Sequence, residues 1–156
     1  MECKRRQRQR GFTLMELLIV IAIIMIILGI ARVKYQAAVM SSHELAALTE
    51  IGTIHQAETQ YMSQFGTFAT SLAQLGPPAS GASGPQAADL MQKSLTEGKA
   101  SGYIFTLAAR PTGYVVTAIP EVFNSTGRRT FYSDESLVIR ANNTQEPATA
   151  TSPEVK

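Results

Sequence analysis

The feature that most constrains this chain is an apolar run of twenty residues near its N-terminus. Phe12 to Ala31 reads FTLMELLIVIAIIMIILGIA and contains one charged residue, Glu16. As an α-helix rising about 1.5 Å per residue, the run is roughly 30 Å long, which matches the hydrocarbon thickness of a bilayer. The run therefore predicts a helix that spans a membrane.

The charges that precede the run predict its orientation. The first ten residues carry a net charge of +4, so the rest of the chain is at −2 within an overall +2. The charged residues are Glu2, Lys4, Arg5, Arg6, Arg8 and Arg10. Basic residues flanking a span stay in the cytoplasm, so the remainder of the chain is sent across the membrane. The sequence pI of 8.8 reflects this segment, and we interpret it as a targeting signal rather than a nucleic-acid-binding face.

A conventional secretory signal peptide also combines a basic start with an apolar stretch. Its apolar region is about 7–15 residues long and ends at a small-x-small cleavage site. Here the run is longer and continues into Arg32-Val33-Lys34-Tyr35, which favours an anchor that is kept. The single cysteine is Cys3, so the body of the chain can form neither an internal disulfide nor a thiolate metal cluster.

Apolar residues at spacings of three and four follow Arg32 and predict that the helix continues. They are Leu45, Leu48, Ile51, Ile54, Tyr61, Met62 and Phe65. Because no proline occurs before Pro77, we expect one helix from about Thr13 to about Gln64.

The remaining sequence predicts short elements separated by turns. We expect a loop over 76–85, a helix over 86–96, a hairpin of strands 103–107 and 114–119 around the turn 110–113, and strands at 129–133 and 137–140. These elements predict an α+β fold, in which a long N-terminal helix, transmembrane in its first half, carries a small antiparallel sheet of three or four strands on its second half. From Ala141 to Lys156 the composition predicts a disordered tail.

The stretch Gly11-Phe12-Thr13-Leu14-Met15-Glu16-Leu17-Leu18-Ile19-Val20 resembles the processing and assembly signal of type IV prepilins and type II secretion pseudopilins. The resemblance implies that a prepilin peptidase in the membrane cuts between Gly11 and Phe12 and then methylates the new amino terminus of Phe12. It implies a structural subunit, not an enzyme, that polymerises with itself and other pilins. The implied partners are an inner-membrane assembly platform with its ATPase and, before assembly, membrane lipid.

With this resemblance the chain divides into five expected segments. They are a basic leader removed by the peptidase (1–11), a transmembrane and filament-core helix (12–32), an amphipathic continuation (33–65), a globular α+β head domain (66–140) and the disordered tail (141–156). The expected location is the bacterial inner membrane with the N-terminus cytoplasmic, and afterwards a surface pilus or a periplasmic pseudopilus. Two features of many major pilins are missing, a helix-breaking proline in the first helix and a C-terminal disulfide loop.

Glu16 is the residue of the apolar run that needs a specific explanation. A charged carboxylate at the centre of a membrane helix costs about 2.5–3.5 kcal/mol on insertion scales. One explanation is that the cleaved amine of Phe12 in a neighbouring subunit pairs with Glu16 and fixes the register of the copies. The alternative is a local capping box, Thr13-x-x-Glu16, at the start of the helix. The two explanations are compatible.

Other candidate residues carry weaker patterns. His43 and His55 lie on the predicted helix without a second catalytic cluster, so we expect packed or solvated side chains. Arg128-Arg129 suits a solvated face better than a DNA-binding patch. Asp134-Glu135 offers fewer oxygen ligands than calcium requires. We therefore expect no metal, no cofactor and no nucleic-acid partner.

Three functions remain open at the level of sequence. The first is a subunit of a type IV pilus-type filament, and the second is a type II secretion pseudopilin forming a periplasmic pseudopilus. The third is a single-pass, membrane-anchored periplasmic domain that binds a ligand or performs hydrolysis. The third accounts for the anchor but leaves Glu16 without a role.

Overall fold

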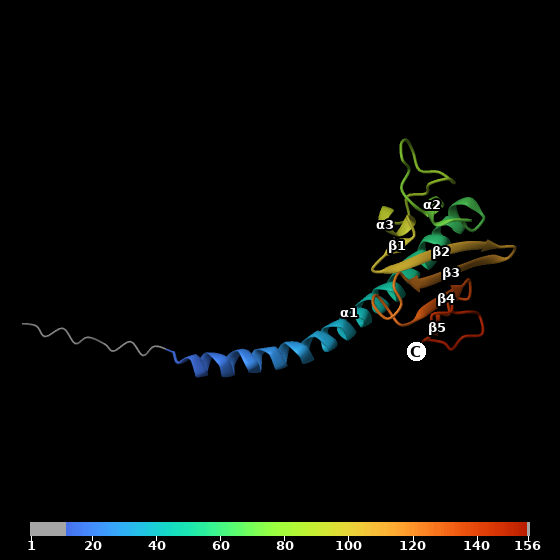
Figure 1. Ribbon diagram of the computed structural model, residues 1–156. Helices are drawn as coiled ribbons and strands as arrows, with labels where there is room; N and C mark the ends of the chain where they lie inside the picture. The colour runs from blue at the N-terminus through green and yellow to red at the C-terminus, as the bar shows by residue number, and fades with distance from the viewer. Residues whose placement is uncertain (1–11, 156) are drawn as a thin grey trace, which may run out of the picture. The chain divides into compact units, whose positions relative to one another are not determined.

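The computed structural model describes residues 12–155, in which a long helix is followed by short helices and a sheet (Figure 1). These residues divide into two units. We call them the N-terminal unit (residues 12–37) and the sheet unit (residues 38–155). One helix of 52 residues, α1 (Leu14–Phe65), contributes to both units. The predicted helix from Thr13 to Gln64 is therefore confirmed to within one residue at each end.

The N-terminal unit is a helix with no core of its own. The large apolar side chains from Phe12 to Ile30 are all exposed, from 48% at Val20 to 88% at Phe12. The apolar stretch of α1 is long enough and apolar enough to cross a membrane, and none of it is buried within the described chain. A helix that is apolar on every side is unfavourable when it is exposed to water. Its side chains need to be covered by lipid or by other protein.

The sheet unit has a core built on one face of α1. A stripe of buried side chains follows the helix at alternating spacings of four and three. Its members are Met40, Glu44, Ala47, Ile51, Ile54, Glu58 and Tyr61. His55 and Ala57 are buried beside this stripe. Leu45 and Met62, two of the apolar residues whose spacing predicted the helix, are 67% and 39% exposed. Each directly follows a residue of the stripe and so lies about 100° around the helix from it.

The sheet has five antiparallel strands in the order in which they occur in the chain. They are β1 (Lys99–Ala100), β2 (Tyr103–Arg110), β3 (Gly113–Pro120), β4 (Thr130–Asp134) and β5 (Arg140–Asn142). Tyr103, Phe105 and Phe131 from the strands share one apolar core with Ile51 and Ile54 of α1. The expected α+β class, with an antiparallel sheet packed on the second half of the helix, is thus confirmed, with five strands instead of three or four.

The predicted hairpin is present, with longer strands than expected. Arg110 pairs with Gly113, so only Pro111 and Thr112 lie between β2 and β3. The strands extend beyond the predicted ends because Ala108 and Ala109 keep pairing with β3 although their side chains are exposed. Pairing of the backbone sets the length of this hairpin more than burial does.

Two other elements are shorter than predicted. The helix expected over 86–96 is limited to α3 (Lys93–Thr96), because Ala88 N and Leu90 N donate to carbonyl groups of α2 (Leu72–Leu75) and its first neighbours instead of forming helical bonds. The strand expected over 137–140 begins only at Arg140. Leu137 has φ of 64° and closes a turn by donating its N–H to Asp134 O at 2.9 Å.

The C-terminal stretch differs from the disordered tail that we expected. Ala141 N donates to Pro153 O and Val155 N donates to Ile139 O, each at 2.9 Å, and Ala148 is buried. The side chain of Arg140 adds an ion pair to Glu154 at 3.1 Å. The composition offers little apolar area, but the backbone of residues 153–155 pairs with residues 139–141 and covers the edge of β5, whose N–H and C=O groups would otherwise be unpaired.

Candidate functional site

The structure describes only one of the two residues at the expected cleavage site. Gly11 lies outside the described residues, whereas Phe12, which would carry the new amino terminus, is 88% exposed just before α1 begins. Phe12 is thus available to an enzyme or a neighbouring chain, as far as the described residues are concerned.

Thr13 and Glu16 form the hydrogen bonds of a capping box at the start of α1. Thr13 N donates to Glu16 Oε2 at 2.8 Å, and Glu16 N donates to Thr13 Oγ1 at 3.2 Å. The Thr13 hydroxyl also donates to Glu16 Oε2, at 2.8 Å. Two N–H groups that the helix itself cannot satisfy are therefore paired, which accounts for part of the local need for Glu16.

The capping box uses only one oxygen of the Glu16 carboxylate. All the hydrogen bonds it accepts end on Oε2, and no basic side chain among the described residues forms an ion pair with it. Oε1 is left to accept from a group outside residues 12–155 or from another molecule. The geometry therefore allows Glu16 to cap its own helix and to bind a cation at the same time.

His55 is the centre of a buried hydrogen-bond network in the sheet unit. Its Nδ1 lies 2.6 Å from Tyr114 Oη and its Nε2 lies 2.8 Å from Ser133 Oγ. Ser133 gives its one hydroxyl proton to Val138 O at 3.0 Å, so Nε2–H must donate to Ser133. Burial lowers the pKa of His55, against the opposing effect of nearby Asp134, and so favours the neutral imidazole. In the neutral ring Nδ1 carries no proton and accepts from Tyr114 Oη.

The contact between Ser133 and His55 has the composition of a nucleophile and its base, but not the required geometry. Ser133 is fully buried, and its proton points to a backbone carbonyl rather than to His55. The pair instead joins α1 to β4 and to the turn after it. His55 is thus packed, and His43 is half-buried with Nδ1 at 3.1 Å from Thr126 O.

Glu58 is a buried carboxyl group that is only half satisfied. It is fully buried, and Oε2 accepts a hydrogen bond from Ala69 N at 3.0 Å. Oε1 has no hydrogen-bond partner among the described residues. Burial raises the pKa of Glu58 to about 7, against the smaller opposing effect of the Ala69 hydrogen bond. The group therefore changes its charge near neutral pH.

Glu44 connects α1 to the start of β4. It accepts from Arg128 N and from Arg129 Nε, each at 2.8 Å. The guanidinium of Arg129 also lies over the Phe131 ring, 5.4 Å from its centroid. Arg129 is therefore held by the fold, which leaves Arg128 alone as a solvated cation of the predicted basic pair.

Asp134 stabilises the turn that follows β4. Its Oδ1 accepts from Ser136 N and Ser136 Oγ at 3.0 and 2.6 Å, and Oδ2 accepts from Tyr132 Oη at 3.2 Å. The hydrogen bond from the Ser136 hydroxyl is the main reason why the pKa of Asp134 is lowered. Across the described residues, no three His, Cys, Asp or Glu side chains converge as they would around a metal ion.

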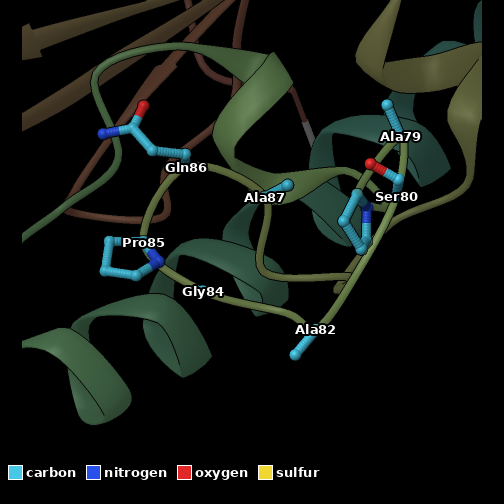
Figure 2. A pocket seen from close by; sticks show the side chains of 8 residues that line it. Ala79, Ser80, Ala82, Gly84, Pro85, Gln86 and Ala87 are labelled. Atoms are coloured by element: carbon cyan, nitrogen blue, oxygen red, sulfur yellow. The ribbon is translucent and has the colours of Figure 1, made fainter.

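The loop between α2 and α3 borders an open hollow of about 340 Å³ (Figure 2). Short, uncharged side chains surround it, and none of them ionises. They are Pro78, Ala79, Ser80, Ala82, Gly84, Pro85, Gln86 and Ala87. The hollow therefore lacks the groups that acid–base or metal chemistry would need.

Sequence reasoning missed Glu44 and Glu58 as structural groups, although a signal was present. Both occupy positions of the buried stripe, seven residues from Ile51, where a carboxylate must find a partner or become neutral. The partners of His55 had no such signal, because Tyr114 and Ser133 lie 59 and 78 residues away in the chain.

A comparison with protein families identifies the N-terminal segment. Residues 6–31 match the prokaryotic N-terminal methylation motif. This motif is the prepilin-type signal of type IV pilins and pseudopilins. The match ends before the sheet unit, and no curated protein and no solved structure matches the chain. The chain thus carries a prepilin-type signal that includes the exposed apolar part of α1, followed by an α+β sheet unit.

Proposed function

We propose that the chain is a pilin-like structural subunit that is cleaved after Gly11, methylated on Phe12 and polymerised through the first half of α1. The observation that carries this proposal is the position of the methylation motif. It covers the one part of the described chain that has apolar side chains on every face and no partner for them. The sheet unit, by contrast, has a buried apolar core of its own.

The same helix would be used in two surroundings. Before assembly, lipid covers the exposed side chains of the N-terminal unit, and in a filament other copies of this helix cover them. Lipid tails and Ile- or Leu-rich helices are similarly apolar, so the transfer from one to the other changes solvation little. An assembly platform with an ATPase in the inner membrane would supply the work of extraction.

Glu16 would fix how far each copy advances along its neighbour. Cleavage leaves a positive amine on Phe12, and the free Oε1 of Glu16 in a neighbouring copy is its partner in this proposal. A charge buried without a partner is strongly disfavoured, so only the register that pairs the two groups is acceptable. The capping box is compatible with this role, since it ends on the other oxygen.

The proposal is tested by determining the N-terminus of the mature protein by mass spectrometry after expression in its own host. We expect a chain that begins with N-methylated Phe12. Gly11→Val should leave the uncut precursor. Gly29→Ala should be processed as usual, because a methyl group there meets no described atom within 4 Å. A mature chain that begins at Met1 would contradict the proposal.

The second candidate is a secretion pseudopilin, since the methylation motif is common to pilins and pseudopilins. A pilus subunit predicts surface fibres that can be sheared off and that disappear when the gene is deleted. A pseudopilin predicts loss of protein secretion while surface pili remain intact. Imaging of sheared fibres and a secretion assay on the same deletion strain separate the two.

A further inference from the structure

The apolar run of α1 ends in three residues whose polar groups have no role in the sheet unit. Arg32 and Lys34 are exposed, and Tyr35 is 71% exposed. No carboxylate among residues 12–155 forms an ion pair with Arg32 or Lys34. We call Arg32, Lys34 and Tyr35 the collar.

The collar lies on one side of the helix. At about 100° per residue, Lys34 lies roughly 200° and Tyr35 roughly 300° around the axis from Arg32, so the three residues fall within an arc of roughly 160°. A membrane surface reaches every side of a helix that crosses it, so it can contact the three groups together. The position of the collar along the helix therefore carries more weight than the side on which it lies.

The collar also lies at the right distance along the helix for a membrane surface. Phe12 to Ala31 covers roughly 30 Å, which is the hydrocarbon core, and the collar follows directly. Long basic side chains extend toward phosphate groups from such positions, and tyrosine rings are enriched at the same level. The ring and the two cations thus match the chemistry of the headgroup layer.

We propose that the collar binds the phosphate headgroups of anionic phospholipids on the membrane face opposite the leader. The proposal rests on the membrane anchoring proposed above. Removal of the leader would take away the five basic residues on the other face, and the collar would then remain as the cationic flank of the span. It would hold the processed chain at a fixed depth until assembly.

Photo-crosslinking from lipid headgroups tests this proposal site by site. The full chain is inserted into vesicles of phosphatidylcholine and phosphatidylglycerol, with a diazirine on the headgroup of either the neutral or the anionic lipid. Digestion after glutamate releases the peptide 17–44, which contains the collar, separately from the leader peptide 3–16. Fragment spectra then locate the labelled residues.

We expect labelling at residues 32–35 to favour the anionic lipid by about fivefold for each cation. The double variant Arg32→Gln, Lys34→Gln should lose this preference while the leader peptide keeps its own. The matched control Lys93→Gln, Arg128→Gln removes two exposed cations of the sheet unit and should change nothing.

Two results would overturn the proposal in distinguishable ways. If residues 13–31 are shielded from a water-soluble label but the collar is labelled equally by both lipids, the chain is anchored and the collar has no lipid preference. If residues 13–31 are themselves labelled from water, the chain has not inserted, and the proposed membrane anchoring is contradicted as well.

Discussion

The two halves of α1 have the same backbone conformation and opposite relations to their surroundings. In the N-terminal unit the large apolar side chains from Phe12 to Ile30 are exposed, whereas in the sheet unit one stripe of the helix is buried under strands. Backbone propensity and the absence of proline make both halves helical. The distribution of side chains around the axis determines what each half binds. An apolar surface on all sides needs lipid or copies of itself, and a single stripe needs one sheet.

The carboxylates on the two halves show the same contrast. Glu16 lies in an exposed apolar segment and has a local partner in Thr13, with one oxygen still available. Glu58 lies under the loop that contains Ala69 and has one oxygen without a partner in the described chain. The first is therefore suited to binding between molecules, and the second makes the stability of one molecule depend on pH.

The largest expected effect on stability comes from truncating one isoleucine to alanine in each half of α1. Ile54→Ala should lower the free energy of unfolding of the sheet unit by about 2–5 kcal/mol, because it leaves a cavity in a core where Ile54 is fully buried. Ile24→Ala should leave that value unchanged, since Ile24 is exposed in the other unit. Urea unfolding of the full chain in detergent, followed by circular dichroism, measures both. Equal losses would show that the two halves unfold as one unit.

Glu58→Gln should remove a pH dependence of stability that arises within the sheet unit. The pKa of Glu58 is about 7 when folded and 4.5 without burial, so the folded state favours the protonated acid. The contribution of the protonated Glu58 side chain to stability is therefore fully present below pH 4.5 and is lost as the pH rises through 7. At pH 8 the variant should be more stable than the natural chain by about 2–3 kcal/mol, and at pH 4 the two should be equal. A constant difference at all pH values, from thermal unfolding, would contradict this explanation.

Tyr114→Phe should destabilise the sheet unit by about 1–2 kcal/mol at pH 8, because His55 Nδ1 is left buried without a donor. Tyr35→Phe is the matched control in the N-terminal unit and should have no effect on unfolding.

The lowered pKa of His55 means that stability is lost as the pH falls below about 6.5, where the unfolded histidine takes up a proton. This loss should be seen most clearly in the Glu58→Gln background, where the opposite contribution is absent.

The smallest expected effect compares two helical glycines. Gly29→Ala and Gly52→Ala each add a methyl group that meets no described atom within 4 Å. Each should favour helix by up to about 1 kcal/mol. Only Gly52→Ala should raise the unfolding midpoint of the sheet unit, since Gly29 lies in the other unit. A rise for both variants would mean that the first half of α1 supports the sheet unit.

Patterns local in sequence predicted the fold well. The ends of α1 and the central hairpin were predicted because helix formation and a two-strand turn depend on neighbouring residues. The buried stripe was predicted only in part. Ile51, Ile54 and Tyr61 are buried, whereas Leu45 and Met62, which fit a helical spacing equally well, are exposed. Which of two adjacent stripes is covered depends on the strands that arrive later in the chain.

The candidate site divides in the same way. The segment around Gly11, Phe12 and Glu16 is contiguous and was therefore visible in the sequence. The network around His55 was not, because its partners come from β3 and β4. The packing of residues 141–155 was missed for a related reason, since it depends on backbone hydrogen bonds to Ile139 and Ala141 that composition does not reveal.

The most direct test of the central claim measures filament yield for variants that separate the two roles of Glu16. Glu16→Gln keeps an oxygen that can accept in the capping box but removes the charge, whereas Thr13→Ala removes the cap hydroxyl and keeps the charge. We expect normal membrane insertion for both, a large loss of sheared filaments for Glu16→Gln and for Glu16→Leu, and nearly normal yield for Thr13→Ala. Full assembly of Glu16→Gln with failure of Thr13→Ala would show that Glu16 only caps its own helix.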